Sequence, residues 1–449
     1  MTDSNSPPRA IGLLTAVSIV IANMVGTGVF TSLAYQADGI KSGFALLFLW
    51  VVGGIFALCG ALAYGELGAA MPRSGGEYRF LSDIYHPAIG FLSGWLSVTV
   101  GFAAPIALAA MALGQYFSAV VPAFHPTAIA LVVTILISVI HARNLKWGSW
   151  FQDSFTLLKV LLIVAFIACG LLFPEPQSLR FFPAPEDTNI IFSAPFAISL
   201  VYVTYAYSGW NAAVYLSSEV KEPEKNVPRS LVLGTAIVMV LYLLVNFVFL
   251  YATPFAAIEA LPFEEKPRIA ALSAEYIFGP FGSKIMSLLI SFGLISTISS
   301  MVWAGPRVTQ AIGEDIPFFA ILSRKNRGGV PQRAIWLQLA IVIIMILTST
   351  FEAVTTYLGF TLTLSSAMAV LGVFVHRKRF PDAPRPYKTW GYPVTPLIFL
   401  GISLWIIVFV LLGKPQISIA GLGTIAIGGL AYLWTSKKKV VSSDASQDR

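Results

Sequence analysis

The stretch between Asp83 and Arg143 contains no Asp, Glu, Lys or Arg. It is long enough for two apolar membrane spans of about 20 residues each. Hydrophobic residues make up 56% of the 449-residue chain and charged residues 11%, a balance that neither soluble domains nor disordered chains have. The apolar run that begins at Ile11 lacks a small-residue cleavage site and is too long for a signal peptide. The chain is therefore predicted to be an all-α, polytopic membrane protein.

The apolar runs and the charged or Gly- and Pro-containing segments between them predict twelve transmembrane helices. The expected spans cover residues 11–33, 43–70, 88–120, 127–140, 155–173, 191–217, 230–251, 278–303, 334–350, 354–375, 394–412 and 417–435. Residues 1–449 are predicted to form a single transmembrane domain whose ends are two short tails, residues 1–10 and 436–449.

The positive charges divide unequally between the two sides of the predicted membrane. Lys159 and Lys284 fall within spans, and most other Lys and Arg fall on the side of the N-terminus. The exceptions are Lys41, Arg180, Lys266, Arg268 and Lys414. This positive-inside bias predicts a multi-pass protein of the cell (inner or plasma) membrane with both termini in the cytoplasm. The net charge of +7 is then a topogenic signal in contact with membrane lipid, and no nucleic-acid partner is expected.

Two of the predicted spans contain interruptions, although lipid offers nothing to satisfy a loosened backbone. The first span reads NMVGTGVF over residues 23–30, and the sixth reads TYAYSGWN over residues 204–211. Spans 1 and 6 are matching members of two five-helix units, and an odd-numbered unit inverts the second copy across the bilayer. Paired interruptions in such repeats indicate a substrate site at the membrane midplane. Close helix packing at the glycines is the alternative explanation.

The chemistry of the predicted site follows from what an unwound helix exposes. Free N–H groups at the start of one half-helix bind an anion, and free C=O groups at the end of the other bind an ammonium. An α-amino acid is the simplest ligand that satisfies both. The predicted substrate-binding residues are Met24, Val25, Gly26, Thr27, Gly28, Tyr205, Ala206, Tyr207, Ser208 and Gly209.

These stretches resemble the amino acid–polyamine–organocation (APC) superfamily, and within it the prokaryotic carriers that are similar to L-type amino acid transporters. GTGVF matches the family's first-helix motif and YAYSGWN is similar to its sixth-helix motif, while residues 65–81 and 219–231 resemble its cytoplasmic signatures. The resemblance implies a LeuT-like fold with helices 1 and 6 unwound. Spans 1, 2, 6 and 7 would move against spans 3, 4, 8 and 9. The implied units are a first inverted repeat (11–173), a second inverted repeat (191–375) and two additional helices (394–435).

The resemblance also implies roles for individual residues. The amides around Thr27 and Gly28 would hold the substrate carboxylate, and the ring of Tyr205 would be an aromatic gate. The carbonyls that would hold the amine are those around Met24, Val25, Tyr205 and Ser208. Ser208 departs from the family's usual Gly, and its added Cβ and hydroxyl put in doubt the room for bulky substrate side chains.

Lys159 lies in the fifth predicted span, where a lysine costs about 3 kcal/mol on insertion scales. On position alone, its ammonium either snorkels to the cytoplasmic interface or has a function. The resemblance implies the second, because some family members bind Na⁺ between helices 1, 5 and 8, where sodium-independent members place a fifth-helix lysine. The implied partners of Lys159 are Ala22, Ser296, Thr297, Ser299 and Ser300. No metal is then expected.

The remaining reactive residues predict no enzyme. Cys59 and Cys169 have no metal-binding spacing, and no nucleophile and base form a recognisable pair, so neither catalytic residues nor a cofactor are expected. Glu66 is interpreted as a solvated or salt-bridged carboxylate beside Arg73 and Arg79. Eukaryotic L-type transporters, which the chain resembles, carry a cysteine in the loop between spans 3 and 4 that bonds to a glycoprotein. Residues 120–127 contain none, so no disulfide-linked heavy-chain partner is expected.

The sequence thus predicts a secondary transporter that moves neutral L-amino acids by alternating access, without sodium and by exchange. A proton-coupled symporter is one alternative. A carrier of cationic amino acids or polyamines is another, although the middles of spans 1, 3, 6, 8 and 10 contain no Asp or Glu. A non-transporting amino-acid sensor is the third, although no soluble domain is present to signal.

Overall fold

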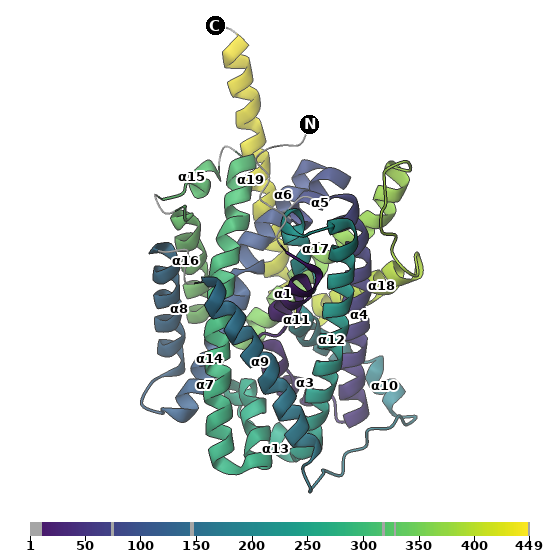
Figure 1. The fold of residues 1–449 in the computed structure, drawn as a ribbon, viewed down its shortest axis with the longest axis vertical. Coiled ribbons are helices and arrows are strands. Elements are labelled where there is room, and N and C mark those ends of the chain that lie inside the picture. The colour runs from purple at the N-terminus through teal and green to yellow at the C-terminus, as the bar shows by residue number, and fades with distance from the viewer. Residues whose placement is uncertain (1–10, 73–75, 144–147, 317–318, 327–328, 448–449) are drawn as a thin grey trace.

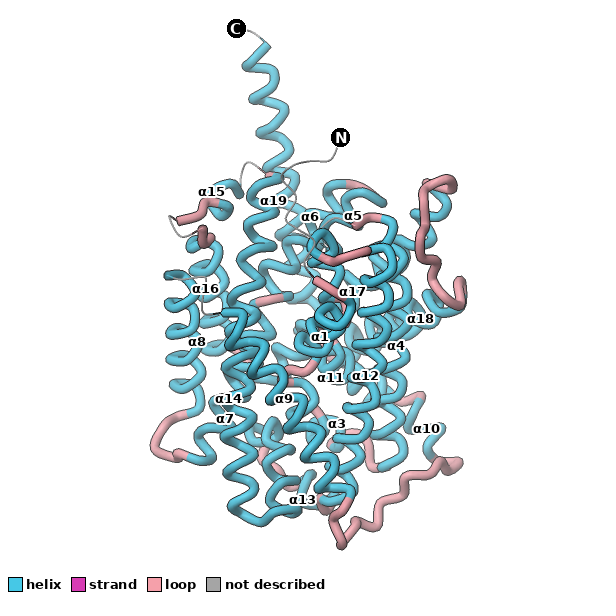
Figure 2. The backbone as a smooth tube through the Cα atoms, viewed as in Figure 1, coloured by secondary structure: helices cyan, strands magenta, loops and turns pink. Residues whose placement is uncertain are grey.

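The computed structural model describes residues 11–72, 76–143, 148–316, 319–326 and 329–447. Apart from one isolated parallel bridge between Ile11 and Val220, the regular structure in these ranges is helical (Figure 2). Within the same ranges, nine helices are long and apolar enough to cross a membrane. Their outer faces expose large apolar side chains such as Val132, Val240 and Leu404. The protein is therefore an all-helical, multi-pass membrane protein.

The first half of the chain contains the helices of the first five predicted spans. They are α1 (Leu13–Met24), α2 (Gly28–Thr31), α3 (Leu33–Ala37), α4 (Gly43–Ala70), α5 (Gly76–Ile84), α6 (Pro87–Leu96), the π-helical turn η1 (Ser97–Gly101), α7 (Ala103–Val120), α8 (Pro126–Arg143) and α9 (Gly148–Leu171). Helix α4 has the bounds that hydropathy predicts, because Ser42 caps its first turn by accepting a hydrogen bond from the amide of Ala45.

The second half continues with shorter connecting helices between the long ones. They are α10 (Asp187–Ile191), α11 (Ala194–Tyr207), the 3₁₀ turn η2 (Ala212–Glu219), α12 (Pro223–Ala252), α13 (Phe255–Glu259), the 3₁₀ turn η3 (Phe263–Arg268), α14 (Ile269–Asp315), α15 (Ala320–Ser323), α16 (Gln332–Thr348), α17 (Phe351–Arg379), α18 (Val394–Gly413) and α19 (Pro415–Gln447).

Two of the predicted spans are shorter than a full membrane crossing. The ninth is an apolar helix over Gln332–Thr348, and the sixth ends as an α-helix at Tyr207. The third is also irregular, because the amide of Phe102 bonds to the carbonyl of Ser97 at 3.1 Å and forms a π-turn. Nothing in the sequence indicated this turn. The number of twelve spans therefore stays a prediction.

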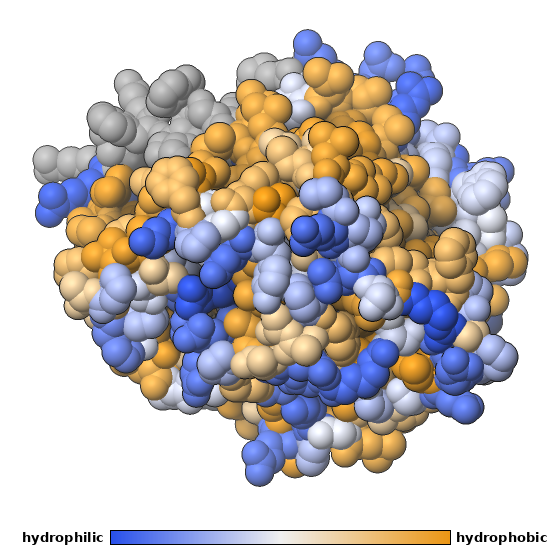
Figure 3. Space-filling view, turned by 90° about the horizontal axis from the view of Figure 1, so that it is seen from below, coloured by the Kyte–Doolittle hydropathy of each residue, from blue (hydrophilic) through white to orange (hydrophobic). Residues whose placement is uncertain are grey.

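The broken first span lies near the middle of the view in Figure 1, with long helices on either side of it. Helix α1 packs against α12, α12 runs along α4, and α14 runs along α7. The short helices α10 and α13 lie at one end of the molecule, and α5 and α15 lie at the other (Figure 1). On the face seen in Figure 3, polar residues gather across the middle and apolar residues form much of the rim. This is the distribution expected where a membrane protein leaves the lipid.

Candidate functional site

The first span is unwound at the predicted stretch. Helix α1 ends at Met24, Val25 leaves the helical region (φ −73°, ψ 81°), and the chain becomes helical again at Gly28. A tight turn forms at the break, where the amide of Gly26 donates to the carbonyl of Met24 at 2.8 Å. The hydroxyl of Thr27 is buried, lies beside the hydroxyl of Tyr205, and has no hydrogen bond of ordinary geometry within the described residues. The break thus contains backbone and side-chain polar groups that the helix does not use.

The sixth span is broken at the matching stretch. Helix α11 ends at Tyr207, Ser208 is extended (φ −56°, ψ 149°), and Gly209 has a φ of +96°. Only glycine adopts this backbone conformation without strain. A Cβ at Gly209 would also lie 2.8 Å from the carbonyl carbon of Asn23. The second break therefore packs directly on the end of α1.

The two spans also touch at Gly28. A Cβ at this position would lie 2.4 Å from the Cα of Ala206 and 2.7 Å from its Cβ. At Gly26 the nearest atoms would be 3.9 Å away, so that glycine is not needed for close packing. Unwinding and close packing were alternative explanations of the glycines, and the structure contains both.

A tyrosine that sequence reasoning missed joins the two breaks. The hydroxyl of Tyr242, in α12, lies 2.6 Å from the carbonyl oxygen of Met24 and 3.1 Å from that of Ala206. It has a single proton and therefore donates to one of these carbonyls at a time. Its ring packs edge-on against Trp50, at 5.7 Å between centroids, and against Tyr207 at 5.1 Å. Nothing in the seventh span sets this residue apart in sequence.

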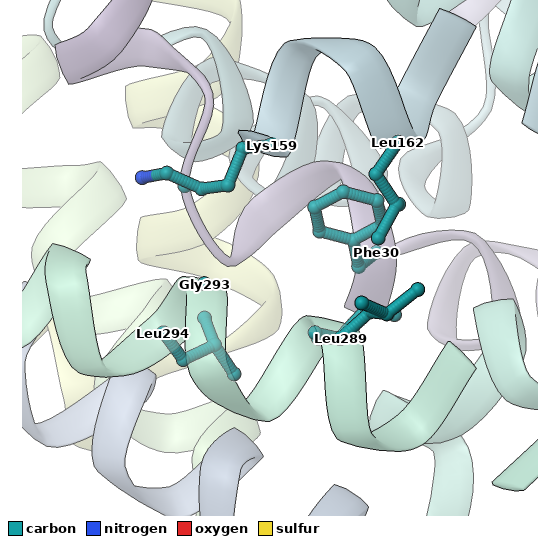
Figure 4. A pocket seen from close by; sticks show the side chains of 8 residues that line it. Phe30, Lys159, Leu162, Leu289, Gly293 and Leu294 are labelled. Atoms are coloured by element: carbon teal, nitrogen blue, oxygen red, sulfur yellow. The ribbon is translucent and has the colours of Figure 1, made fainter. Parts of the chain in front are cut away.

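Lys159 reaches inward to the first break, so the snorkelling alternative is wrong. Its Nζ donates to the carbonyl of Val25 and to the hydroxyl of Thr297, both at 3.1 Å, and the residue is 8% exposed. Figure 4 shows the side chain extending past the unwound segment, beside Gly293. A Cβ at Gly293 would lie 3.1 Å from Cγ of Lys159. A cavity of about 10 Å³ adjoins the lysine and also reaches Phe30, which is space for about one water molecule.

The predicted partners of Lys159 need correction. The carbonyl it bonds belongs to Val25 instead of Ala22, because Val25 lies beyond the end of α1 and its oxygen is not used by the helix. Successive residues of α14 point about 100° apart, so only one of the four predicted hydroxyls faces the lysine. Within the described residues the other three do not bond to the lysine: Ser299 pairs with His141 at 2.8 Å, Ser300 donates to the carbonyl of Thr297 at 2.9 Å, and Ser296 is buried.

An aromatic cluster joins the chain that follows the first break to three other elements. The ring of Tyr35 stacks on Tyr202 at 5.4 Å and on Phe351 at 5.9 Å, and meets Phe263 edge-on at 5.5 Å. These rings come from α3, α11, α17 and η3. Four separate elements therefore meet in this cluster.

Glu66 is a salt-bridged carboxylate, one of the two alternatives that the sequence left open, but it lies within a helix and its partner is not the expected one. Glu66 is fully buried in α4 and accepts two hydrogen bonds from Arg377 of α17, at 2.8 and 2.6 Å, and one from the amide of Thr389 at 2.7 Å. Arg79 instead lies near the end of α14, and Arg73 is outside the described residues. Glu66 belongs to a structural ion pair between the second and tenth spans.

Known proteins match this chain over nearly its whole length. A family model described as amino acid permease matches residues 11–427. The serine/threonine exchanger SteT of Bacillus subtilis (strain 168) is 30% identical, over 98% of this chain and 100% of that protein. The large neutral amino acids transporter small subunit 2 of Homo sapiens is 27% identical, over 97% of the chain and 82% of that protein. The b(0,+)-type amino acid transporter 1 of Mus musculus is 26% identical, over 92% of the chain and 84% of that protein. The family resemblance found in the sequence is confirmed.

Proposed function

Because the chain belongs to the amino acid permease family, we propose that it exchanges neutral L-amino acids by alternating access and without sodium. The observation that carries the proposal is the contact between two broken helices. Gly28 of the first packs on Ala206 of the sixth, and Gly209 of the sixth packs on Asn23 of the first. A substrate held there would contact both helices at once, so their relative movement would be coupled to binding.

We assign this function to twelve spans arranged as a LeuT-like 5+5 inverted repeat, with repeats over residues 11–173 and 191–375 and two further helices over residues 394–435. In this arrangement spans 1, 2, 6 and 7 move against spans 3, 4, 8 and 9. The positive-inside distribution of Lys and Arg supports a plasma or inner membrane location with both termini in the cytoplasm. Cys59 and Cys169 both lie within helices, which supports transport without a disulfide-linked partner.

The substrate groups match the polar atoms at the breaks. The carboxylate would accept hydrogen bonds from the amides around Thr27 and Gly28, beside the buried hydroxyl of Thr27. The ammonium would share the carbonyls of Met24 and Val25, which already accept from Tyr242 and Lys159. A carbonyl oxygen has two lone pairs, so the Val25 oxygen has room for a second donor. The Met24 oxygen accepts from both Tyr242 and the amide of Gly26, so the ammonium would take the place of one of these donors.

The position of Lys159 supports independence from sodium. Its ammonium occupies the space between a backbone carbonyl and the Thr297 hydroxyl, the neutral oxygens that hard cations prefer. A second cation 4 Å away would be repelled by about 4 kcal/mol at an effective dielectric constant of 20. The lysine would therefore supply permanently the charge that sodium supplies in other carriers.

Ser208 supports a preference for small substrates. It stands in the second break, where its Cβ and hydroxyl reduce the space and add a hydrogen-bonding group. The bacterial relative is a serine/threonine exchanger, which favours alanine, serine and threonine as substrates here. Because the human relative is named for large neutral amino acids, leucine is the large substrate with which the small ones should be compared.

Counterflow tests this function. Proteoliposomes loaded with unlabelled alanine should accumulate external labelled alanine, and external serine and threonine should compete more strongly than leucine. We expect Ser208→Gly to increase competition by leucine. Stronger competition by lysine or putrescine would show a cationic carrier instead. Saturable binding of alanine without counterflow would show a sensor.

A further inference from the structure

The two stretches that resemble cytoplasmic and sixth-helix signatures of the family meet at one buried carboxylate. Glu77, at the start of α5, is 5% exposed. Its Oε1 accepts hydrogen bonds from Tyr64 at 2.6 Å, from Asn211 at 3.2 Å and from Ser366 at 3.4 Å. Its Oε2 accepts one from Ser365 at 2.7 Å. One side chain thus collects four donors.

These donors come from three different predicted spans. Tyr64 lies in α4, Asn211 follows the second break directly, and the two serines lie in α17. The ion pairs formed by the described residues do not include Glu77. Among the described residues, neutral donors therefore replace the water that a buried carboxylate would otherwise need.

Aromatic packing brings the inner half of the sixth span to the same place. The ring of Tyr64 meets Trp210 edge-on at 4.7 Å. Gly76 has a φ of +55°, and a Cβ there would lie 2.2 Å from the ring of Tyr215. The chain from Trp210 to Tyr215, which begins just after the break at Gly209, is therefore docked on the start of α5.

We propose that Glu77 is a positioning residue that anchors the inner half of the sixth span and so controls opening of the site toward the α5 end. This inference rests on the transport function proposed above. Moving Asn211 away from the serines of α17 would remove donors from a buried carboxylate, a costly change until water reaches it. The anchored conformation is thus favoured, and release of Glu77 accompanies opening.

The anchor predicts opposite changes in KM at the two ends of the transporter. If Glu77→Gln weakens the anchored conformation, the conformation open toward the α5 end becomes more populated. Apparent affinity scales with the population of the competent conformation. The KM for substrate supplied at the α5 end should therefore fall, and the KM at the opposite end should rise, with the ratio of the two changing at least fivefold.

The experiment measures exchange KM from each side separately, in inside-out and right-side-out membrane vesicles. Wild type is compared with Glu77→Gln, Glu77→Asp and Glu175→Gln, the last an exposed carboxylate in the loop after α9. We expect Glu77→Asp to restore part of the wild-type ratio, because it keeps the charge. Glu175→Gln should keep the ratio unchanged. If Glu77→Gln does not fold, Asn211→Ala and Ser365→Ala each remove one donor and should shift the ratio in the same direction.

The outcomes separate the two proposals. Absence of alanine exchange by wild type would refute the transport function. Exchange by wild type together with an unchanged KM ratio in the Glu77 and donor variants would refute the anchor alone. Equal changes of KM on both sides, with a lower unfolding temperature, would show a merely structural role and would also refute it.

Discussion

Replacing Gly28 with alanine places one methyl group between the two broken helices. The new Cβ would lie 2.4 Å from the Cα of Ala206, whereas ordinary contacts begin near 3.4 Å. The first and sixth spans must therefore separate by about 1 Å, since no rotamer change removes a collision with backbone. Overpacking of this kind costs about 1–3 kcal/mol. If the cost falls on the transport cycle, exchange slows by between about 5-fold and 150-fold.

The assay is labelled alanine exchange in proteoliposomes, with the unfolding temperature and the gel-filtration profile as controls for folding. Gly401→Ala in α18 is the matched control, because its Cβ would meet nothing within 4 Å, and we expect exchange within about twofold of wild type. Adding Ala206→Gly to Gly28→Ala should restore only part of the activity, because the Cα of residue 206 remains. Wild-type exchange by Gly28→Ala would refute the claim that this contact belongs to the working site.

Three further variants test other contacts. Tyr242→Phe removes the hydroxyl that joins the two breaks and should slow exchange by about 3- to 10-fold, which corresponds to the free energy of one hydrogen bond. The unfolding temperature should stay unchanged. A normal rate of exchange would show that the hydroxyl is dispensable. Lys159→Met should slow alanine exchange at least about tenfold, because two charge-assisted hydrogen bonds are lost. The control variant Lys284→Met, at an exposed position of α14, should not slow exchange. Equal rates for the two variants would contradict the assigned role of Lys159. Arg377→Met removes the nearer ion-pair partner of the buried Glu66 and leaves it with Arg385, at 4.0 Å. This should lower the free energy of unfolding by about 3 kcal/mol, measured in detergent by thermal or denaturant unfolding; wild-type stability would argue against the ion pair.

The sequence alone predicts the positions of the helices and of both breaks, because each depends on local chemistry. Hydropathy and the Ser42 cap determine the bounds of α4. The glycines locate the two interruptions, since a backbone that leaves the helix or turns at positive φ needs them. Lys159 stands out for a similar reason, because a lysine in an apolar span is rare.

The contacts between distant segments could not be predicted from one sequence. Glu66 and Arg377 are separated by 311 positions and Glu77 and Ser365 by 288, and no local pattern indicates which spans are neighbours. Tyr242 is likewise an ordinary aromatic residue until α12 is placed beside both breaks. The partners of Lys159 depend on the rotation of α14 about its axis, which a stretch of four hydroxyl residues does not reveal.

The most direct test of the central claim is to measure which gradient drives alanine uptake. Purified protein is reconstituted into empty or alanine-loaded vesicles, and labelled alanine uptake is measured in sodium or choline buffer and across an imposed pH gradient. The account predicts strong stimulation by internal alanine, equal in both buffers and without the gradient. A requirement for sodium would contradict the role of Lys159, and pH-driven uptake into empty vesicles would replace exchange with proton coupling.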